Sequence, residues 1–138
     1  MAAHLLAGIL CSLAAFHFYW AAGGQWGNQA TIPHAGGKPL IHPGAGAAIA
    51  IAVLLLIGAT GAVVQFDPWL KTQFLRAMAL VFALRALGDF HYIGFFKQSN
   101  DSLFAYWDTR LFSPLCVLLA ILAAAASFAG PTASKVSR

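Results

Sequence analysis

The residues with the clearest chemical potential are a charged pair inside a mostly apolar stretch. Arg85 and Asp89 lie in the segment from Thr72 to Phe96. A charge deep in a membrane-spanning helix is costly, so it is usually paired or functional. A spacing of four residues predicts that both side chains share one helical face. Two interpretations remain open: a buried ion pair that fixes this helix to its neighbours, or a pair that binds or relays a polar group of a substrate.

Further polar and aromatic residues are expected on the same side of the membrane as this pair. The candidate polar site consists of Arg85, Asp89, His17, His91, Trp20, Trp26, Trp107 and Asp108. His34, His42 and Asp101 are expected at the same surface. For the Trp and Tyr residues taken singly, an ordinary aromatic belt at the membrane interface is the favoured explanation.

Three kinds of chemistry can be compared with these residues. Asp89, His17 and His91 could perform acid–base chemistry, because histidine titrates near neutral pH and a buried aspartate can be tuned. A Zn or Cu site from the histidines and an aspartate matches no recognised ligand spacing. Haem binding would require two histidines that face each other across a bundle. His4 and His17 are 13 residues apart and fall on roughly opposite faces of one helix. We therefore predict no cofactor and no metal.

Composition predicts the surroundings of these residues. Of the 138 residues, 60% are hydrophobic and 9% are charged, and the mean hydropathy is +0.75. Soluble domains carry roughly a quarter charged residues. Lipid is therefore the expected solvent for most of the chain. The net charge of +4 comes from positive residues near the ends of apolar segments, which argues against nucleic-acid binding.

Four apolar stretches predict a single transmembrane domain over residues 1–138. The spans are expected at about 3–22, 44–66, 72–96 and 113–129, each near the length that crosses a hydrocarbon core. The fold class is all-α, a four-helix antiparallel bundle whose small residues let helices approach closely. The small residues are Gly46, Ala50, Gly58, Gly61 and Ala62 in the second span, with Ala120 and Ala123 to Ala126 in the fourth.

The connections between the spans are unequal. A long extracytoplasmic loop is expected from Gly23 to Pro43, and a tight turn from Asp67 to Lys71. Apolar and aromatic residues between Lys97 and Phe112 predict a short interfacial helix before the fourth span. Ser113 and Pro114 are expected to open that span as N-cap and first helical residue.

The positive-inside rule favours both termini in the cytoplasm. The side of the membrane expected to hold both termini carries four positive residues: Lys71, Arg76, Lys135 and Arg138. The side of the two long loops carries three: Lys38, Lys97 and Arg110.

Three motifs together resemble the "domain of unknown function 3995" family of small bacterial integral membrane proteins. They are the segment from His17 to Gly27, the segment from Leu84 to Phe90, and the segment from Phe104 to Thr109 that continues to Ser113–Cys116. The resemblance implies a four-helix protein of the bacterial inner membrane and carries no known activity. A looser likeness to four-helix sterol-isomerase-type domains is architectural, and architecture does not establish function.

Three functions are compatible with these features. The first expectation is a non-enzymatic accessory or interaction subunit of a membrane assembly, which suits the small size and short loops. The second is a binder or transporter of a small molecule, lipid or ion at the outer half of the bundle. The third is a membrane-embedded acid–base enzyme acting on a lipophilic substrate. Expected partners are membrane lipids and a larger membrane complex or further copies of the chain.

Overall fold

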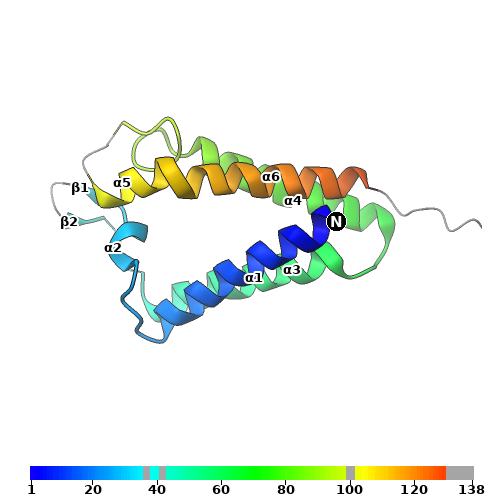
Figure 1. Ribbon diagram of the computed structural model, residues 1–138, viewed down its shortest axis with the longest axis horizontal. Coiled ribbons are helices and arrows are strands. Elements are labelled where there is room, and N and C mark those ends of the chain that lie inside the picture. The colour runs from blue at the N-terminus through cyan, green and yellow to red at the C-terminus, as the bar shows by residue number, and fades with distance from the viewer. Residues whose placement is uncertain (36–37, 41–42, 99–101, 130–138) are drawn as a thin grey trace, which may run out of the picture.

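The computed structural model describes residues 1–35, 38–40, 43–98 and 102–129, and confirms the all-α fold (Figure 1). Four long helices run alternately in opposite directions. They are α1 (Ala2–Ala21), α3 (Ala45–Val63), α4 (Pro68–Leu87) and α6 (Ser113–Phe128). The short elements are helices α2 (Asn28–Thr31) and α5 (Leu103–Trp107), the π-helical turn η1 (Asp108–Phe112), and the antiparallel two-residue strands β1 (His34–Ala35) and β2 (Lys38–Pro39).

The four helices form two pairs that meet at one end of the molecule. Helix α1 packs mainly on α3, and α4 packs mainly on α6. The main core cluster includes Leu6 and Leu10 of α1, Leu75 of α4 and Leu119 in the middle of α6. At the opposite end, where α2 and α5 lie, the pairs separate (Figure 1). The main hydrophobic cluster therefore lies toward one end of the bundle, which we call the closed end.

Small residues allow the close approach at the closed end. Ala59 and Ala62 of α3 and Ala123 and Ala126 of α6 are buried in the core cluster. A Cβ atom built on Gly61 would lie 2.5 Å from the Phe74 ring. Backbones can approach this closely only where side chains are small, as expected for helices that associate in lipid.

Three helices are long and apolar enough to cross a membrane. They are Ala2–Ala21, Ala45–Val63 and the continuous helix Leu103–Phe128. Helix α4 has the same length as α1, 20 residues, but carries Lys71, Arg76 and Arg85. These charges lower the mean hydropathy of α4 below that of the other long helices.

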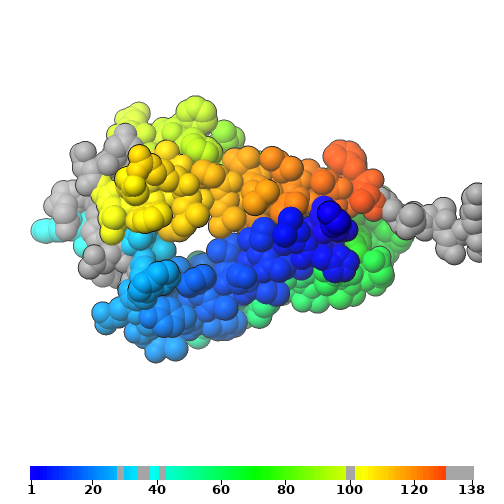
Figure 2. Space-filling model, in the orientation of Figure 1, coloured from blue at the N-terminus to red at the C-terminus, as the bar shows by residue number. Residues whose placement is uncertain are grey.

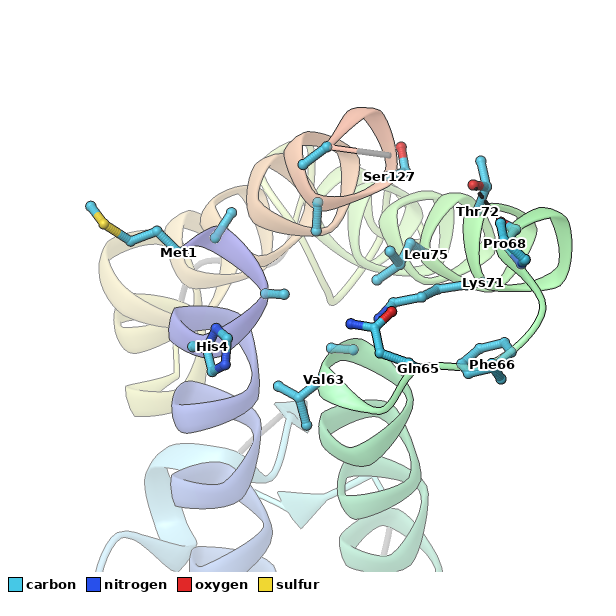
Figure 3. Close-up of a pocket in the computed structure, with 15 residues that line it drawn as sticks. Met1, His4, Val63, Gln65, Phe66, Pro68, Lys71, Thr72, Leu75 and Ser127 are labelled. Carbon is cyan, nitrogen blue, oxygen red and sulfur yellow. Dashed lines mark hydrogen bonds between the residues drawn. The ribbon is translucent and has the colours of Figure 1, made fainter. Parts of the chain in front are cut away.

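The turn between α3 and α4 is fixed by polar contacts at the closed end. Asp67 caps α4 by accepting a hydrogen bond of 2.9 Å from the backbone N–H of Leu70. Lys71 reaches back and donates to the carbonyl of Val64 at 2.9 Å. A small pocket of about 240 Å³ lies here between the start of α1, the end of α3 and the start of α4 (Figure 3). The predicted tight turn is confirmed, with Asp67 as its cap.

Two predicted helix boundaries were wrong. Helix α4 ends at Leu87 and not at Phe96, because Gly88 adopts a positive φ of 84° that breaks the helix. The last long helix begins at Leu103 and not at Ser113, since α5, η1 and α6 form one continuous helix. The short helix before the fourth span is present, and its position at a membrane interface stays a prediction.

The π-helical turn explains how this helix passes through Pro114. Proline has no N–H to donate to the carbonyl four residues earlier, so the regular ladder cannot continue there. Just before it, the N–H of Ser113 donates to the carbonyl of Asp108, five residues back, which defines the π turn. Ser113 therefore has helical backbone angles and is not an N-cap. The cap is Ser102, whose Oγ accepts from the N–H of Ala105 at 3.1 Å.

The two serines should respond differently to substitution by alanine. Ser102→Ala removes the cap and is expected to lower the free energy of unfolding by about 1 kcal/mol. Ser113→Ala removes a buried hydroxyl that has no hydrogen-bond partner among the described residues, so it should be neutral or stabilising. Thermal unfolding in detergent measures both. A greater loss from Ser113→Ala than from Ser102→Ala would contradict this assignment.

Candidate functional site

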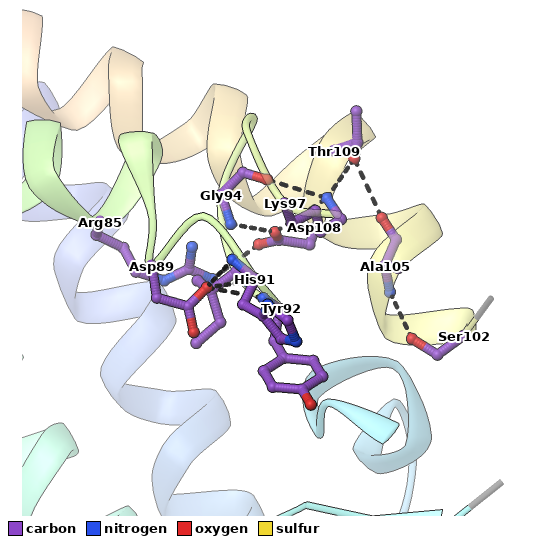
Figure 4. Close-up of polar contacts among 11 residues, drawn as sticks. Arg85, Asp89, His91, Tyr92, Gly94, Lys97, Ser102, Ala105, Asp108 and Thr109 are labelled. Carbon is purple, nitrogen blue, oxygen red and sulfur yellow. Dashed lines mark hydrogen bonds and ion pairs between the residues drawn. The ribbon is translucent and has the colours of Figure 1, made fainter. Parts of the chain in front are cut away.

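Arg85 pairs with Asp108 and not with Asp89, which corrects the prediction from the i, i+4 spacing. Because α4 ends at Leu87, Asp89 leaves the helical face that carries Arg85. Arg85 Nη2 instead lies 2.8 Å from Oδ1 of Asp108 on η1 (Figure 4). The ion pair therefore joins α4 to the last long helix, through an aspartate other than the one predicted.

Asp108 is the centre of a cluster that also includes Lys97. The Asp108 side chain is fully buried, and its Oδ2 lies 3.3 Å from Lys97 Nζ and accepts a 2.7 Å bond from the N–H of Gly94. Lys97 Nζ also donates to the carbonyl of Gly94 at 3.1 Å and to the hydroxyl of Thr109. We call Arg85, Lys97 and Asp108 the ion cluster. It ties the segment after α4 to both α4 and η1.

Asp89 organises the loop that follows α4. Its Oδ1 accepts backbone N–H bonds from His91, Tyr92 and Ile93 at 2.9, 2.7 and 2.9 Å. Desolvation raises the pKa of this carboxyl, but these hydrogen bonds to the charged form outweigh it, and the pKa lies below its usual range. Asp89 thus serves as a local cap of this loop.

A large cavity lies between the helix pairs at the open end. Its volume is about 780 Å³, within the range of roughly 300–1,000 Å³ that is usual for small-molecule sites. It is lined by the second half of α1, the following turn, α2, and the continuous helix from Leu103 to Leu115. In Figure 2 it opens on the face between α1 and that helix.

Four of the predicted site residues line this cavity. They are His17, Trp20, Trp26 and Trp107. The turn after α1 folds back so that the Trp20 indole Nε1 donates to the carbonyl of Trp26 at 2.9 Å, and the Trp26 ring stacks on Phe16 with centroids 6.0 Å apart. Gly24 permits this turn, since a Cβ atom there would lie 2.3 Å from the Tyr19 ring. The chain thus turns its aromatic residues inward at the mouth of the cavity.

The eight predicted residues therefore fall into three groups. Arg85 and Asp108 join the ion cluster, while His17 and the three tryptophans line the cavity. Asp89 and His91 stay in the loop after α4, where the His91 ring contacts Tyr92. Of the three residues considered for acid–base chemistry, Asp89 and His91 are thus not brought together with His17 around this cavity.

Within the described part of the chain, no three His, Cys, Asp or Glu side chains gather as metal ligands would. His42 and Asp101 lie outside the described residues, as do the terminal Lys135 and Arg138 that entered the orientation argument.

Sequence reasoning missed Lys97 and most of the cavity wall. Lys97 was counted only as a loop charge, although it directly follows the apolar run from Ile93 to Phe96. The wall of the last helix consists of Leu103, Trp107, Leu111, Phe112 and Leu115. Leu103, Trp107, Leu111 and Leu115 recur every four residues, a period that marks one helical face. Reading this stretch as one helix would have exposed the pattern.

The fold and the cavity define an all-α protein with three helices that could span a membrane and an apolar site between its helix pairs. The chain belongs to the family described as "Protein of unknown function (DUF3995)", whose sequence model matches residues 10–123. This confirms the resemblance drawn from the three motifs. Comparisons with curated proteins and with solved structures found no match.

Removing the charge of Asp108 should be far more damaging than removing that of Asp89. Asp108→Asn leaves Lys97 buried and Arg85 partly buried without a counter-charge, which is expected to cost roughly 3–5 kcal/mol. Asp89→Asn keeps an acceptor oxygen on an exposed side chain and should cost less than about 1 kcal/mol. Thermal unfolding of both variants in detergent tests this. The reverse order would restore Asp89 as the partner of Arg85.

The loop that carries Lys97 should depend on glycine at position 88. Gly88 has φ of 84°, and a Cβ atom there would lie 1.6 Å from the carbonyl oxygen of Ile93. Gly23 has a similar φ of 92° with open space around it, so it is a matched control. Gly23→Ala should cost about 1 kcal/mol of stability from backbone strain alone, and Gly88→Ala clearly more. If both substitutions lowered the unfolding temperature equally, the loop would have rearranged to relieve the clash at position 88, and the prediction would be wrong.

Proposed function

We propose that this protein binds a lipophilic molecule in the cavity between its two helix pairs. The supporting observation is the cavity itself, about 780 Å³ in volume and lined mainly by aromatic and aliphatic side chains. Ligand sites are typically concave and apolar with a few placed polar groups, and His17, Gln25 and Thr31 are the polar side chains here.

The position of the opening favours a ligand that comes from the bilayer. The cavity opens between α1 and the last helix, so an apolar chain can enter it from the side. Such a chain would contact the aromatic and aliphatic lining, and the apolar surface buried in this way favours binding.

The same proposal includes a membrane topology. Helix α4 is antiparallel to α6, packs on it, and at 20 residues is about 30 Å long, enough to span a hydrocarbon core. Lys71 and Arg76 lie in its first half near the closed end, and Arg85 is paired with Asp108, which it shares with Lys97. We therefore propose four crossings of a bacterial inner membrane, with the closed end in the cytoplasm. Both long connections would then lie on the outer side, and the cavity would lie in the outer half of the membrane.

The expectation of an accessory subunit stays a prediction. It depends on the small size and short loops, and no feature of the described residues favours a particular partner chain. The cavity is a specific observation that favours binding, so we place ligand binding first.

Ligand binding can be tested with the tryptophans that the cavity provides. Trp20, Trp26 and Trp107 line it, whereas Trp69 is exposed at the start of α4. A brominated alkyl chain quenches a tryptophan that it touches. In Trp69→Phe protein in phosphatidylcholine nanodiscs, methyl 9,10-dibromostearate should quench fluorescence saturably. The difference in fluorescence between the wild type and Trp69→Phe comes from Trp69. Quenching of this difference should increase linearly with the amount of probe in the bilayer and should not saturate.

Narrowing the cavity should weaken this binding. Leu111→Phe, in the Trp69→Phe background, places a larger ring on the cavity wall and is expected to reduce affinity about tenfold, equivalent to 1.4 kcal/mol. Leu118→Phe is the matched control, because Leu118 lies on the same helix with similar exposure, 42% against 47%, and does not line the cavity. Quenching that never saturates, or equal effects of both substitutions, would refute the proposal.

A further inference from the structure

The cavity lining carries no charge of its own. Among the described residues that line it, none is Asp, Glu, Lys or Arg. The cations of the ion cluster, Arg85 and Lys97, bond to Asp108 on the other side of η1 and do not line the cavity. A charged group in an apolar site without a counter-charge is strongly disfavoured. The lining therefore selects for an uncharged ligand.

His17 supplies a defined hydrogen-bonding group at the cavity wall. Its Nδ1 lies 2.8 Å from the carbonyl oxygen of Leu13, one turn earlier on α1. A carbonyl can only accept, so Nδ1 must carry the hydrogen. In the neutral ring the other nitrogen, Nε2, then has a lone pair and acts as an acceptor. The backbone of α1 thus sets the tautomer of this histidine.

Among the described residues, no group donates a hydrogen bond to Nε2 of His17, which belongs to the cavity lining. The Trp20 ring packs edge-on against the His17 ring, with centroids 5.1 Å apart, but its Nε1 donates to the carbonyl of Trp26. The Trp20 N–H is therefore committed elsewhere. Gln25, whose carboxamide can both donate and accept, lines the same cavity. A ligand group that donates to His17 could also accept from Gln25, as a hydroxyl does.

We infer that the ligand is an uncharged lipid alcohol, with its apolar chain in the cavity and its hydroxyl donating to Nε2 of His17. This inference rests on the proposed function and narrows it to one chemical class. A fatty-acid anion would bring an unpaired charge into the cavity. An ester without a hydroxyl would cover Nε2 and leave it without a hydrogen-bond donor. The alcohol alone satisfies both the uncharged lining and the acceptor.

Three brominated chains of equal length separate these possibilities. They are 9,10-dibromo-octadecanol, methyl 9,10-dibromostearate and 9,10-dibromostearate, each titrated into Trp69→Phe protein in phosphatidylcholine nanodiscs. At pH 8 imidazole is uncharged and a carboxylic acid is ionised. With probe concentrations expressed per mole of bilayer lipid, the alcohol should bind about tenfold more tightly than the ester, and the carboxylate more weakly than either.

Substitutions at His17 assign the preference to this side chain. His17→Phe keeps a flat ring and removes the acceptor, so the alcohol should lose its advantage over the ester. His17→Gln restores an acceptor oxygen and should recover part of the advantage. His4→Phe is the matched control, because His4 lies on the same helix at the closed end, where it lines the small pocket.

The possible outcomes distinguish this inference from the proposal on which it rests. Equal saturable quenching by all three probes would overturn the inference and leave the binding cavity intact. A preference for the alcohol that persists in His17→Phe would overturn it as well. The absence of saturable quenching by every probe would refute the proposed function and the inference together.

Discussion

The buried carboxylate of Asp108 is the interaction on which the open half of the molecule depends. The closed end holds together by apolar packing among four helices, but the helix pairs separate beyond it. In the open half, Asp108 connects three parts of the chain through its bonds to Arg85, Gly94 and Lys97. Two cations and a backbone N–H surround one carboxylate, so its charge is well compensated despite complete burial. Without it, the loop after α4 would lose the polar contacts of Gly94 and Lys97 to Asp108 and keep that of Lys97 to Thr109.

The π-helical turn lets one helix serve two surfaces. Asp108 faces the ion cluster, while the adjacent Trp107 and the later Leu111 line the cavity. The ion cluster therefore fixes the rotation of the helix that forms one cavity wall. On the opposite wall, the bond from His17 to Leu13 and the bond from Trp20 to Trp26 orient the aromatic side chains of α1. Each wall is thus held by polar contacts made within its own helix pair, and α2, which packs on α5, joins the two pairs at the open end.

Hydropathy and residue size were sufficient to predict the general fold. The apolar stretches located all four long helices, and the small residues of α3 and α6 indicated the close packing at the closed end. The helix boundaries failed where single backbone features override apolar composition. Gly88 ends α4 in the middle of an apolar run, and the π turn carries the last helix through Pro114. Neither event has a signal in hydropathy, because both depend on φ and on backbone hydrogen bonds.

The site was predicted unevenly for the same reason. Residue type alone identified members of both sites. The charged residues Arg85 and Asp108 are paired, and the cavity is lined by His17, Trp20, Trp26 and Trp107. The partners were wrong because the i, i+4 rule holds only while the helix continues, and α4 ends between Arg85 and Asp89. Lys97 could not be assigned, since its burial depends on the fold of a whole loop against η1.

The separation of charge from cavity supports the proposal of ligand binding over the acid–base alternative. An acid–base enzyme needs its titratable groups around one reacting centre. Here the carboxylates are committed to structure, Asp108 within the ion cluster and Asp89 to three backbone N–H groups, while His17 lines the cavity without them. A single hydrogen-bond acceptor in an uncharged, aromatic site can orient a ligand. Proton transfer needs a second titratable group, and besides His17 the polar groups of the described lining residues are an amide, a hydroxyl and indole N–H groups. The arrangement suits recognition of a lipid far better than its chemical conversion.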